Sequence, residues 1–276
     1  MKFKYLGTAA AEGWPAVFCN CDHCLRAKKA GGKNLRTRSQ SLINEDLLID
    51  FPIDTYAHAL KNQLDLSAVK YCLFTHQHMD HCTPVDLFCR ADGVYAHKLT
   101  EPEIKIICNQ AVKDRIYKTL NAHDDEAFNF GVSFDIIPLY TPQKYGKYTV
   151  TSMKANHAEN AVIYIINDGE KTILYLHDTG ELFDEVYDYL TANKIKADFV
   201  SYDCTFVALK GSGGHMGLDT NIITRDKLKQ LGIIDENTIN CINHFSHNGK
   251  LIYDELVPVA EKEGFLTSYD GMELEI

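Results

Sequence analysis

The stretch Thr75-His-Gln-His-Met-Asp-His81 decides both the fold and the chemistry expected of this chain. Four of its side chains are of types that bind metal ions: His76, His78, Asp80 and His81. The run before them, residues 69–75, is β-branched and apolar enough to form a buried strand. The four side chains therefore lie on the loop where a core strand ends, which is a rigid place to hold metal ions.

In such a loop, His76 and His78 can reach one ion, which leaves Asp80 and His81 for a second. A polar turn of hydrogen-bonded histidines is the alternative reading. Three imidazoles and one carboxylate within six positions favour metal binding over that alternative.

The composition is that of one globular domain, which we expect to span residues 1–276. Hydrophobic residues make up 45% of the chain and charged residues 24%, an ordinary balance for a protein with a real core. The net charge is −10 and no run is rich in lysine or arginine, which disfavours a general nucleic-acid surface. No apolar segment reaches the length of a membrane span. Residues 1–7 alternate like a first strand rather than a signal peptide, so we expect a cytoplasmic protein that binds no membrane.

Strand-like and helix-like runs follow one another along the chain. The expected strands are Lys2–Leu6, Ser41–Ile43, Leu47–Ile49, Lys70–Phe74, Ile104–Ile107, Phe134–Leu139, Tyr148–Lys154, Ala161–Ile166, Thr172–Leu176, Phe199–Tyr202, Thr238–Ile242 and Met272–Leu274. The expected helices are Thr55–Gln63, Gln110–Leu120, Glu181–Asn193, Thr220–Leu231 and Tyr253–Glu263. This order predicts a layered α/β domain with two sheets inside and helices outside. The stretch from about 90 to 130 is the least patterned, and we interpret it as a lid or insert.

Three further segments place a ligand-type side chain at or just after the end of an apolar run. His157 follows one run, Asp178 follows another in Leu174-Tyr-Leu-His-Asp178, and His244 follows a third. Taken singly, His157 is more often a surface or capping residue, and Asp178 is more often a turn or helix-capping residue. Their order and their shared position at strand ends favour a common site.

The series His-x-His-x-Asp-His, then His, Asp and His, resembles the ligand pattern of the metallo-β-lactamase superfamily. The resemblance covers nearly the whole chain and implies a four-layered αββα sandwich with the metals at one edge of the two sheets. It assigns His76, His78 and His157 to one ion and Asp80, His81 and His244 to the other, with Asp178 bridging both. It also matches Asp50 to an aspartate that supports a ligand from behind. A residue that simply ends a strand is the equal alternative for Asp50.

These ligand types indicate hydrolysis. Nitrogen and carboxylate ligands suit Zn, Mn or Fe, and the sequence does not choose among them. Two ions about 3.5–4 Å apart can hold a hydroxide and clamp the oxygens of an in-line displacement. The β-lactam hydrolases carry a cysteine at the position of Asp178, which argues against antibiotic hydrolysis and toward phosphodiester or thioester cleavage.

The segment Cys19-Asn-Cys-Asp-His-Cys24 is a second metal motif, a zinc knuckle at about residues 19–24. The thiols of Cys19, Cys21 and Cys24 fit three corners of a tetrahedral zinc site. A fourth ligand would come from His23 or from elsewhere in the chain. A cysteine-rich loop without metal is the alternative.

The knuckle after Leu6-Gly-Thr-Ala-Ala-Ala-Glu-Gly13, together with the ending Tyr269-Asp-Gly-Met-Glu273, resembles the PhnP type of phosphodiesterase. That resemblance implies a structural zinc whose fourth ligand is His247. We prefer His247 to His23 because a ligand distant in sequence would fasten the N-terminal loop to the rim of the active site, so that this zinc contributes to folding.

The same resemblance places a histidine near the substrate phosphate, and the matching residue is His215, in Gly213-Gly-His-Met-Gly217. His215 and Asp80 are the residues expected to take part in catalysis, with His215 protonating a leaving group or binding a phosphoryl oxygen. A mobile surface histidine is the alternative. The glycines at 211–214 lack the lysine and spacing of a phosphate-binding P-loop.

The sequence thus predicts a dinuclear-metal-dependent phosphodiesterase. It would act by attack of a metal-bound hydroxide, and the resemblance to PhnP-type enzymes implies a small cyclic or diester phosphate, such as a ribose cyclic phosphate, as the substrate. The alternatives are a thioesterase of glyoxalase II type and a non-catalytic metal-binding protein that retains the fold. The expected binding partner is a small-molecule phosphate ester. The chain could also pair with a second copy to form a homodimer. The acidic segment His123–Glu126 lies in the stretch expected to set specificity.

Overall fold

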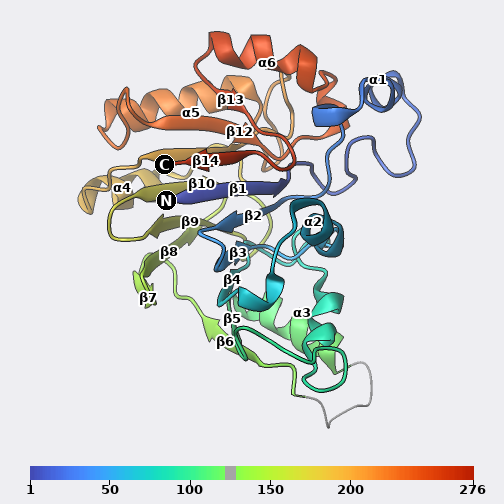
Figure 1. Cartoon of the computed structure of the whole chain (residues 1–276). Coiled ribbons are helices and arrows are strands. Elements are labelled where there is room, and N and C mark those ends of the chain that lie inside the picture. The colour runs from blue at the N-terminus through green and yellow to red at the C-terminus, as the bar shows by residue number, and fades with distance from the viewer. Residues whose placement is uncertain (122–128) are drawn as a thin grey trace.

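The computed structural model describes residues 1–121 and 129–276, and two seven-stranded sheets lie face to face within it (Figure 1). The first sheet has the order β14 (Glu273–Glu275), β1 (Lys2–Gly7), β2 (Gln40–Ile43), β3 (Leu47–Ile49), β4 (Tyr71–Leu73), β5 (Ile104–Cys108) and β6 (Val132–Ile136). The second has the order β13 (Leu266–Thr267), β12 (Ile239–Asn243), β11 (Phe199–Asp203), β10 (Thr172–Leu176), β9 (Val162–Asn167), β8 (Tyr148–Lys154) and β7 (Gln143–Tyr145).

The helices are connected to these strands at intervals along the chain. They are α1 (Asp22–Ala30), α2 (Thr55–Asn62), α3 (Gln110–Leu120), α4 (Asp184–Ala192), α5 (Leu218–Gln230) and α6 (Tyr253–Lys262). Four short 3-10 turns accompany them: η1 (Gly32–Asn34), η2 (Leu66–Ala68), η3 (Pro84–Arg90) and η4 (His247–Gly249).

Alternating side chains explain why each sheet has two covered faces. In β3, Leu47 and Ile49 pack between the two sheets, whereas Leu48 packs on the opposite face with side chains of α3. On the second sheet, Tyr175 of β10 faces the layer between the sheets and Leu174 packs on the outer face. Both faces of both sheets are therefore apolar.

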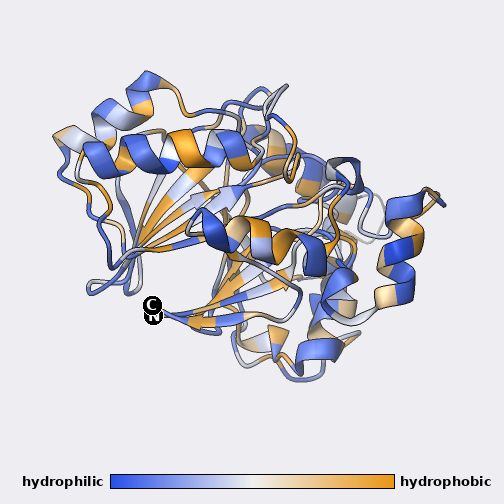
Figure 2. Ribbon diagram, turned by 90° about the horizontal axis from the view of Figure 1, so that it is seen from above, coloured by the Kyte–Doolittle hydropathy of each residue, from blue (hydrophilic) through white to orange (hydrophobic). Residues whose placement is uncertain are grey.

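Helices cover the two outer faces. Val112, Ile116 and Leu120 of α3 pack on the first sheet, and α4 and α5 pack on the second. The residues of α3 recur every four positions, which turns one stripe of that helix inward. Figure 2 shows hydrophobic segments along the strands, and hydrophobic and hydrophilic segments that alternate along the helices. The expected αββα sandwich is confirmed.

The strand order brings distant loops to one edge of the sandwich. Strands β3, β4 and β5 run parallel to one another, as do β10, β11 and β12, so the carboxyl ends of each set share an edge. Strand β8 also shares the direction of β10, because each is antiparallel to β9. The loops after these strands carry the residues singled out above.

The stretch from about 90 to 130 contains regular elements. Strand β5 lies between β4 and β6, and α3 covers the first sheet, so residues 104–120 belong to the main layers. His123–Glu126 lie outside the described residues. A lid function for the stretch stays a prediction. Within residues 1–121 and 129–276, no helix combines the length and apolar character needed to cross a membrane.

Candidate metal centre

Asp50, which follows β3, holds the loop after β4 in place through hydrogen bonds. The carboxylate of Asp50 accepts hydrogen bonds from the backbone N–H of Thr75 at 2.8 Å and from its hydroxyl at 3.0 Å. The Nδ1 atom of His81 lies 2.7 Å from the other carboxylate oxygen. Asp50 is wholly buried, so it holds the His81 ring in one orientation with Nε2 toward the site. The supporting contact expected of Asp50 is present.

A first group of four ligand-type atoms forms where the β4, β8 and β10 loops meet. Its members are His76, His78, His157 and Asp178, and one ligand atom of each lies within 4.8 Å of all the others. Nε2 of His76 is 3.2 Å from Oδ2 of Asp178, and Nε2 of His157 is 3.2 Å from Nδ1 of His78. The grouping expected for one ion is thus present as a cluster of donor atoms.

A second group of four lies beside the first and shares Asp178 with it. Its members are Asp80, His81, Asp178 and His244, again with one ligand atom each within 4.8 Å of all the others. Nε2 of His81 is 2.8 Å from Oδ2 of Asp178 and 3.2 Å from Nε2 of His244. Asp178 therefore stands where a bridging carboxylate would stand.

The donor set fits two divalent cations. Among the described residues, Nε2 of His76 and Oδ1 of Asp178 are buried polar atoms that make no hydrogen bond. The Oδ1 atom does lie 3.0 Å from Nδ1 of His244, but not in hydrogen-bonding geometry. Buried polar atoms without partners are costly, and a cation between the two groups would satisfy them.

The electrostatics of the second group also indicate a need for positive charge. Burial alone would lower the pKa of His244, but the carboxylates of Asp178, Asp203 and Asp80 raise it to about 10. Burial likewise opposes protonation of His81, yet its three carboxylate neighbours raise its pKa well above the ordinary value. The acidic groups would therefore stabilise either imidazolium ions or bound cations.

Three site residues have backbone conformations that favour glycine. Asp50, Asp178 and His244 have φ values of 64°, 50° and 63°. Left-handed conformations are uncommon for non-glycine residues and cluster at functional sites. Asp50 and His244 follow a strand directly and Asp178 is the second residue after β10, so the turn at each strand end redirects the side chain into the site.

His215 lies at the mouth of the site, and Asp203 holds it there. Nδ1 of His215 is 3.1 Å from Oδ2 of Asp203 and 3.5 Å from Oδ1 of Asp178. The wholly buried Asp203 also accepts hydrogen bonds from the backbone N–H groups of Thr205 and Met216. Burial would raise the pKa of Asp203, but its hydrogen bonds and charge interactions with His215 and His244 lower it to about 2, which keeps the carboxylate ionised.

Our sequence reading missed Asp203. It ends the apolar run of β11 in the same way that Asp178 and His244 follow β10 and β12, so the strand-end pattern could have found it. His177, beside Asp178, takes no part in either group. Its Nε2 atom is 2.6 Å from the hydroxyl of Ser201 in the layer between the sheets.

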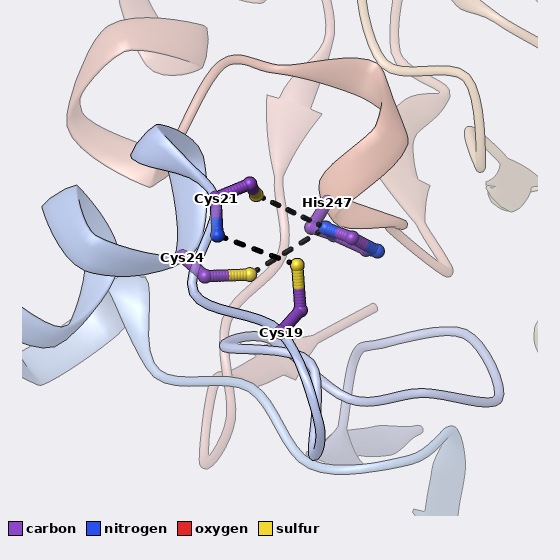
Figure 3. Close-up of side chains that lie close together, drawn as sticks. All are labelled: Cys19, Cys21, Cys24 and His247. Atoms are coloured by element: carbon purple, nitrogen blue, oxygen red, sulfur yellow. Dashed lines mark hydrogen bonds between the residues drawn. The ribbon is translucent and has the colours of Figure 1, made fainter.

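The cysteine motif forms a separate cluster in which the N-terminal segment meets η4 (Figure 3). One ligand atom from each of Cys19, Cys21, Cys24 and His247 lies within 4.8 Å of all the others. Nδ1 of His247 is 3.5 Å from the sulfurs of both Cys21 and Cys24. His23 instead contacts the guanidinium of Arg26.

Three sulfurs and one imidazole nitrogen are a donor set that fits tetrahedral zinc. The hydrogen bond with His247 lowers the pKa of Cys21 to about 6, which favours the thiolate form that binds metal. The backbone N–H groups of Cys21 and Ala16 point at the sulfurs of Cys19 and Cys24. The cluster is therefore a candidate structural zinc site.

Solved structures share this fold at low sequence identity. The chain superimposes on Zn(2+)-bound PqqB from Methylobacterium extorquens with a TM-score of 0.76 at 19% identity, covering 100% of both chains. It superimposes on a diphosphatase from the PhnP family with a TM-score of 0.72 at 17% identity, covering 100% of this chain and 97% of that one. For human tRNase Z, short form, the values are 0.68 and 16%, with coverage of 100% and 99%.

A search of curated proteins gave no match. The model of the β-lactamase superfamily domain matches residues 46–230, which is more than half of the chain and includes all the loops of the candidate centre except that of His244. The chain therefore belongs to the β-lactamase superfamily.

Proposed function

We propose that this chain is a dinuclear-metal-dependent phosphodiesterase that hydrolyses a small cyclic or diester phosphate. The observation that carries the proposal is the shared position of Asp178. Asp178 belongs to both groups of ligand atoms, and its Oδ1 atom lies 3.5 Å from Nδ1 of His215. The contact of Asp203 with the same Nδ1 atom orients His215 toward Asp178. A paired metal site with a histidine at its mouth suits attack on phosphorus with protonation of the departing oxygen.

The residues have distinct parts in this reaction. His76, His78, His157 and Asp178 would hold one cation, and Asp80, His81, His244 and Asp178 the other. When bound, such cations activate water near neutral pH and neutralise charge on phosphoryl oxygens. Asp50 keeps the His81 ring in place. Asp203 accepts from Nδ1–H of His215, so that Nε2 of His215 is free to give a proton to the leaving group.

Two further facts support a small phosphate ester as substrate. One of the solved structures with this fold is described as a diphosphatase from the PhnP family, a name that points to chemistry at phosphorus. The net charge of −10 argues against a long nucleic acid as the substrate of this chain. Zn, Mn and Fe all suit the nitrogen and carboxylate donors, and the cysteine cluster would take a structural zinc.

Metal analysis combined with a substrate panel tests the proposal. The panel holds an aryl phosphodiester, a ribose cyclic phosphate, a glutathione thioester and a precursor tRNA. We expect three metal ions per chain and turnover of one or both small phosphodiesters. Turnover of the thioester alone would favour the glyoxalase II alternative, and bound metal with no turnover would favour a non-catalytic protein.

Replacing His78 by alanine should remove one ion and reduce phosphodiester turnover by at least about 100-fold, because catalysis needs both cations. His97→Ala is the matched control, since His97 is an exposed histidine outside both groups. Full activity in His78→Ala would overturn the proposal.

A further inference from the structure

A cavity of about 370 Å³ opens beside the metal centre, and His157 is the one candidate ligand among the described residues that line it. We call it the His157 pocket. It lies where the ends of three strands meet, with Asn109 following β5, Lys154 ending β8 and Val162 beginning β9. The backbone N–H of Val162 donates to the carbonyl oxygen of Thr75 at 3.0 Å. The pocket floor is therefore hydrogen-bonded to the loop that carries His76.

The walls of the pocket are mainly apolar. Ile137 and Leu139 approach from the segment after β6, and Phe183 from the segment before α4. Leu139 is 45% exposed. An exposed leucine is ordinary by itself, but here it joins two other large apolar side chains around a hollow. A mostly apolar hollow with a few polar groups at its edge is the usual form of a small-molecule site.

Polar groups at the rim carry both signs of charge. The ammonium of Lys154 lies 4.9 Å from the centre of the Phe183 ring and 4.0 Å from the carboxylate of Glu185. Glu159 also borders the hollow. Because these exposed charges offset one another, the rim does not select an anion. Selectivity among ligands would therefore come from the apolar wall.

On the far side of the rim, Asn109 fixes the loop of His157 in place. Its amide nitrogen donates to the carbonyl oxygen of Asn160 at 2.7 Å, and its amide oxygen accepts from the backbone N–H of Val112 at the start of α3. The pocket is thus bounded by β5, α3 and the His157 loop together. A preformed hollow needs little reorganisation to accept a ligand.

We propose that the His157 pocket receives the departing alcohol of the substrate, and that this alcohol carries an apolar or aromatic body. The proposal rests on the phosphodiesterase function and names its substrate class. In the reaction, the oxygen of water bonds to phosphorus and the bond from phosphorus to the alcohol oxygen breaks. The alcohol leaves with a proton from His215, and a phosphate monoester remains.

A pair of aryl phosphodiesters tests this substrate class. Both release phenols of matched acidity, and one phenol carries an added butyl chain. In the wild-type protein loaded with metal, we expect the butyl diester to have a KM about tenfold lower, because burial of four methylene or methyl groups is favourable. Leu139→Gln should remove most of that advantage, with its effect on KM rather than on kcat.

Leu231→Gln is the matched control. Leu231 is 38% exposed and lies at the far end of α5, about 20 Å along the helix from Gly217. The advantage of the butyl diester should persist in this variant. Equal KM values for the two diesters in the wild type, or an advantage that survives Leu139→Gln, would overturn the proposal.

Binding of the free butylphenol separates the two proposals from each other. Calorimetry should show that it binds the wild type and Leu231→Gln but binds Leu139→Gln about tenfold more weakly. If neither diester is hydrolysed but the phenol binds in this way, the phosphodiesterase function fails and the pocket stands. If the diesters are hydrolysed and the phenol does not bind, the pocket assignment fails alone.

Discussion

A single backbone carbonyl connects the two histidines that have different parts in the proposed reaction. The carbonyl oxygen of Gly214 lies 3.2 Å from Nδ1 of His157, and the next residue is His215. A hydrogen bond at Nδ1 fixes the tautomer of a ligating imidazole and leaves Nε2 free for the metal. The His215 loop therefore positions a candidate ligand of the first group.

Gly214 is also held where a side chain has no room. Its φ is +87°, and an added Cβ would lie 3.1 Å from Cα and Nδ1 of His157. Gly180, two residues after Asp178, also lies near this point, because its own added Cβ would be 3.4 Å from Cα of Gly214. The close approach of these glycines lets three site loops meet.

We predict that Gly214→Ala displaces His157 and weakens the binding of one of the two active-site ions by roughly 10–100-fold. This range is typical when a residue that hydrogen-bonds to a metal ligand is changed. Competition with a chelator, followed by metal counting, measures this loss. One ion should become labile while the ion of the Asp80 group and the cysteine-bound zinc remain. Gly213→Ala is the control, because Gly213 also has a positive φ of 59° but an added Cβ meets nothing within 4 Å. Equal metal affinity in the two variants would refute a positioning role for Gly214.

At the scale of elements, the C-terminal segment closes the fold through Asp270. Its carboxylate accepts from the Thr8 hydroxyl at 2.6 Å, and from the backbone N–H and hydroxyl of Thr37 at 2.7 and 2.6 Å. The buried guanidinium of Arg36 donates to the same Thr8 hydroxyl and to the carbonyl oxygen of Ser268. The characteristic ending Tyr269–Glu273 is thus a clamp on the N-terminal loop.

Asp270→Ala should reduce the free energy of unfolding by about 3 kcal/mol, because it leaves buried donors and a buried cation without their anionic partner. Urea titration of the metal-loaded protein measures the change. Asp226→Ala is the control, since the Asp226 side chain is 60% exposed. A loss below about 1 kcal/mol for Asp270→Ala would show that the clamp does not stabilise the fold.

The cysteine cluster joins two elements that are far apart in sequence. Cys21 and Cys24 flank the start of α1, whereas His247 begins η4, three residues after His244. Zinc here should therefore stabilise the fold by about 4 kcal/mol when its free concentration is 1,000 times Kd. We predict that His247→Ala loses one zinc per chain and lowers Tm by several degrees. Cys89→Ser, at an exposed free thiol outside the cluster, should change neither metal content nor Tm.

The helices and strands were predicted with different success, which depended on how clearly each hydrophobic pattern appears in the sequence. Strands β3 and β10 have the predicted bounds because uninterrupted β-branched or apolar runs specify buried strands. Helix α1 was not predicted, because only two of its nine residues, Cys24 and Ala27, are buried and one of these is a cysteine of the metal motif. Strand β13, with two residues, is formed by pairing with β12 rather than by any local preference.

At the scale of the whole molecule, the candidate centre joins the two sheets. The His76–His81 loop belongs to the first sheet, and His157, Asp178 and His244 all follow strands of the second. The grouping of these residues was predicted from the resemblance of the motif order to the metallo-β-lactamase superfamily. The roles of Asp203 and Gly214 were not predicted. Asp203 shares the position at a strand end but was overlooked, and Gly214 acts through one hydrogen bond between loops that no local pattern records.

Because ligands from both sheets meet at one edge, bound ions should resist separation of the sheets there. Removing them should lower Tm by several degrees and speed hydrogen exchange in the site loops, while β3 and β10 in the centre stay protected. Chelation would also strip the cysteine cluster, so the comparison is made in His247→Ala, which already lacks that zinc. If chelation still lowers the Tm of this variant, the decrease reports the stabilisation by the active-site ions alone. An unchanged Tm and unchanged exchange would show that the two sheets are held together by their apolar layer and not by the metal centre.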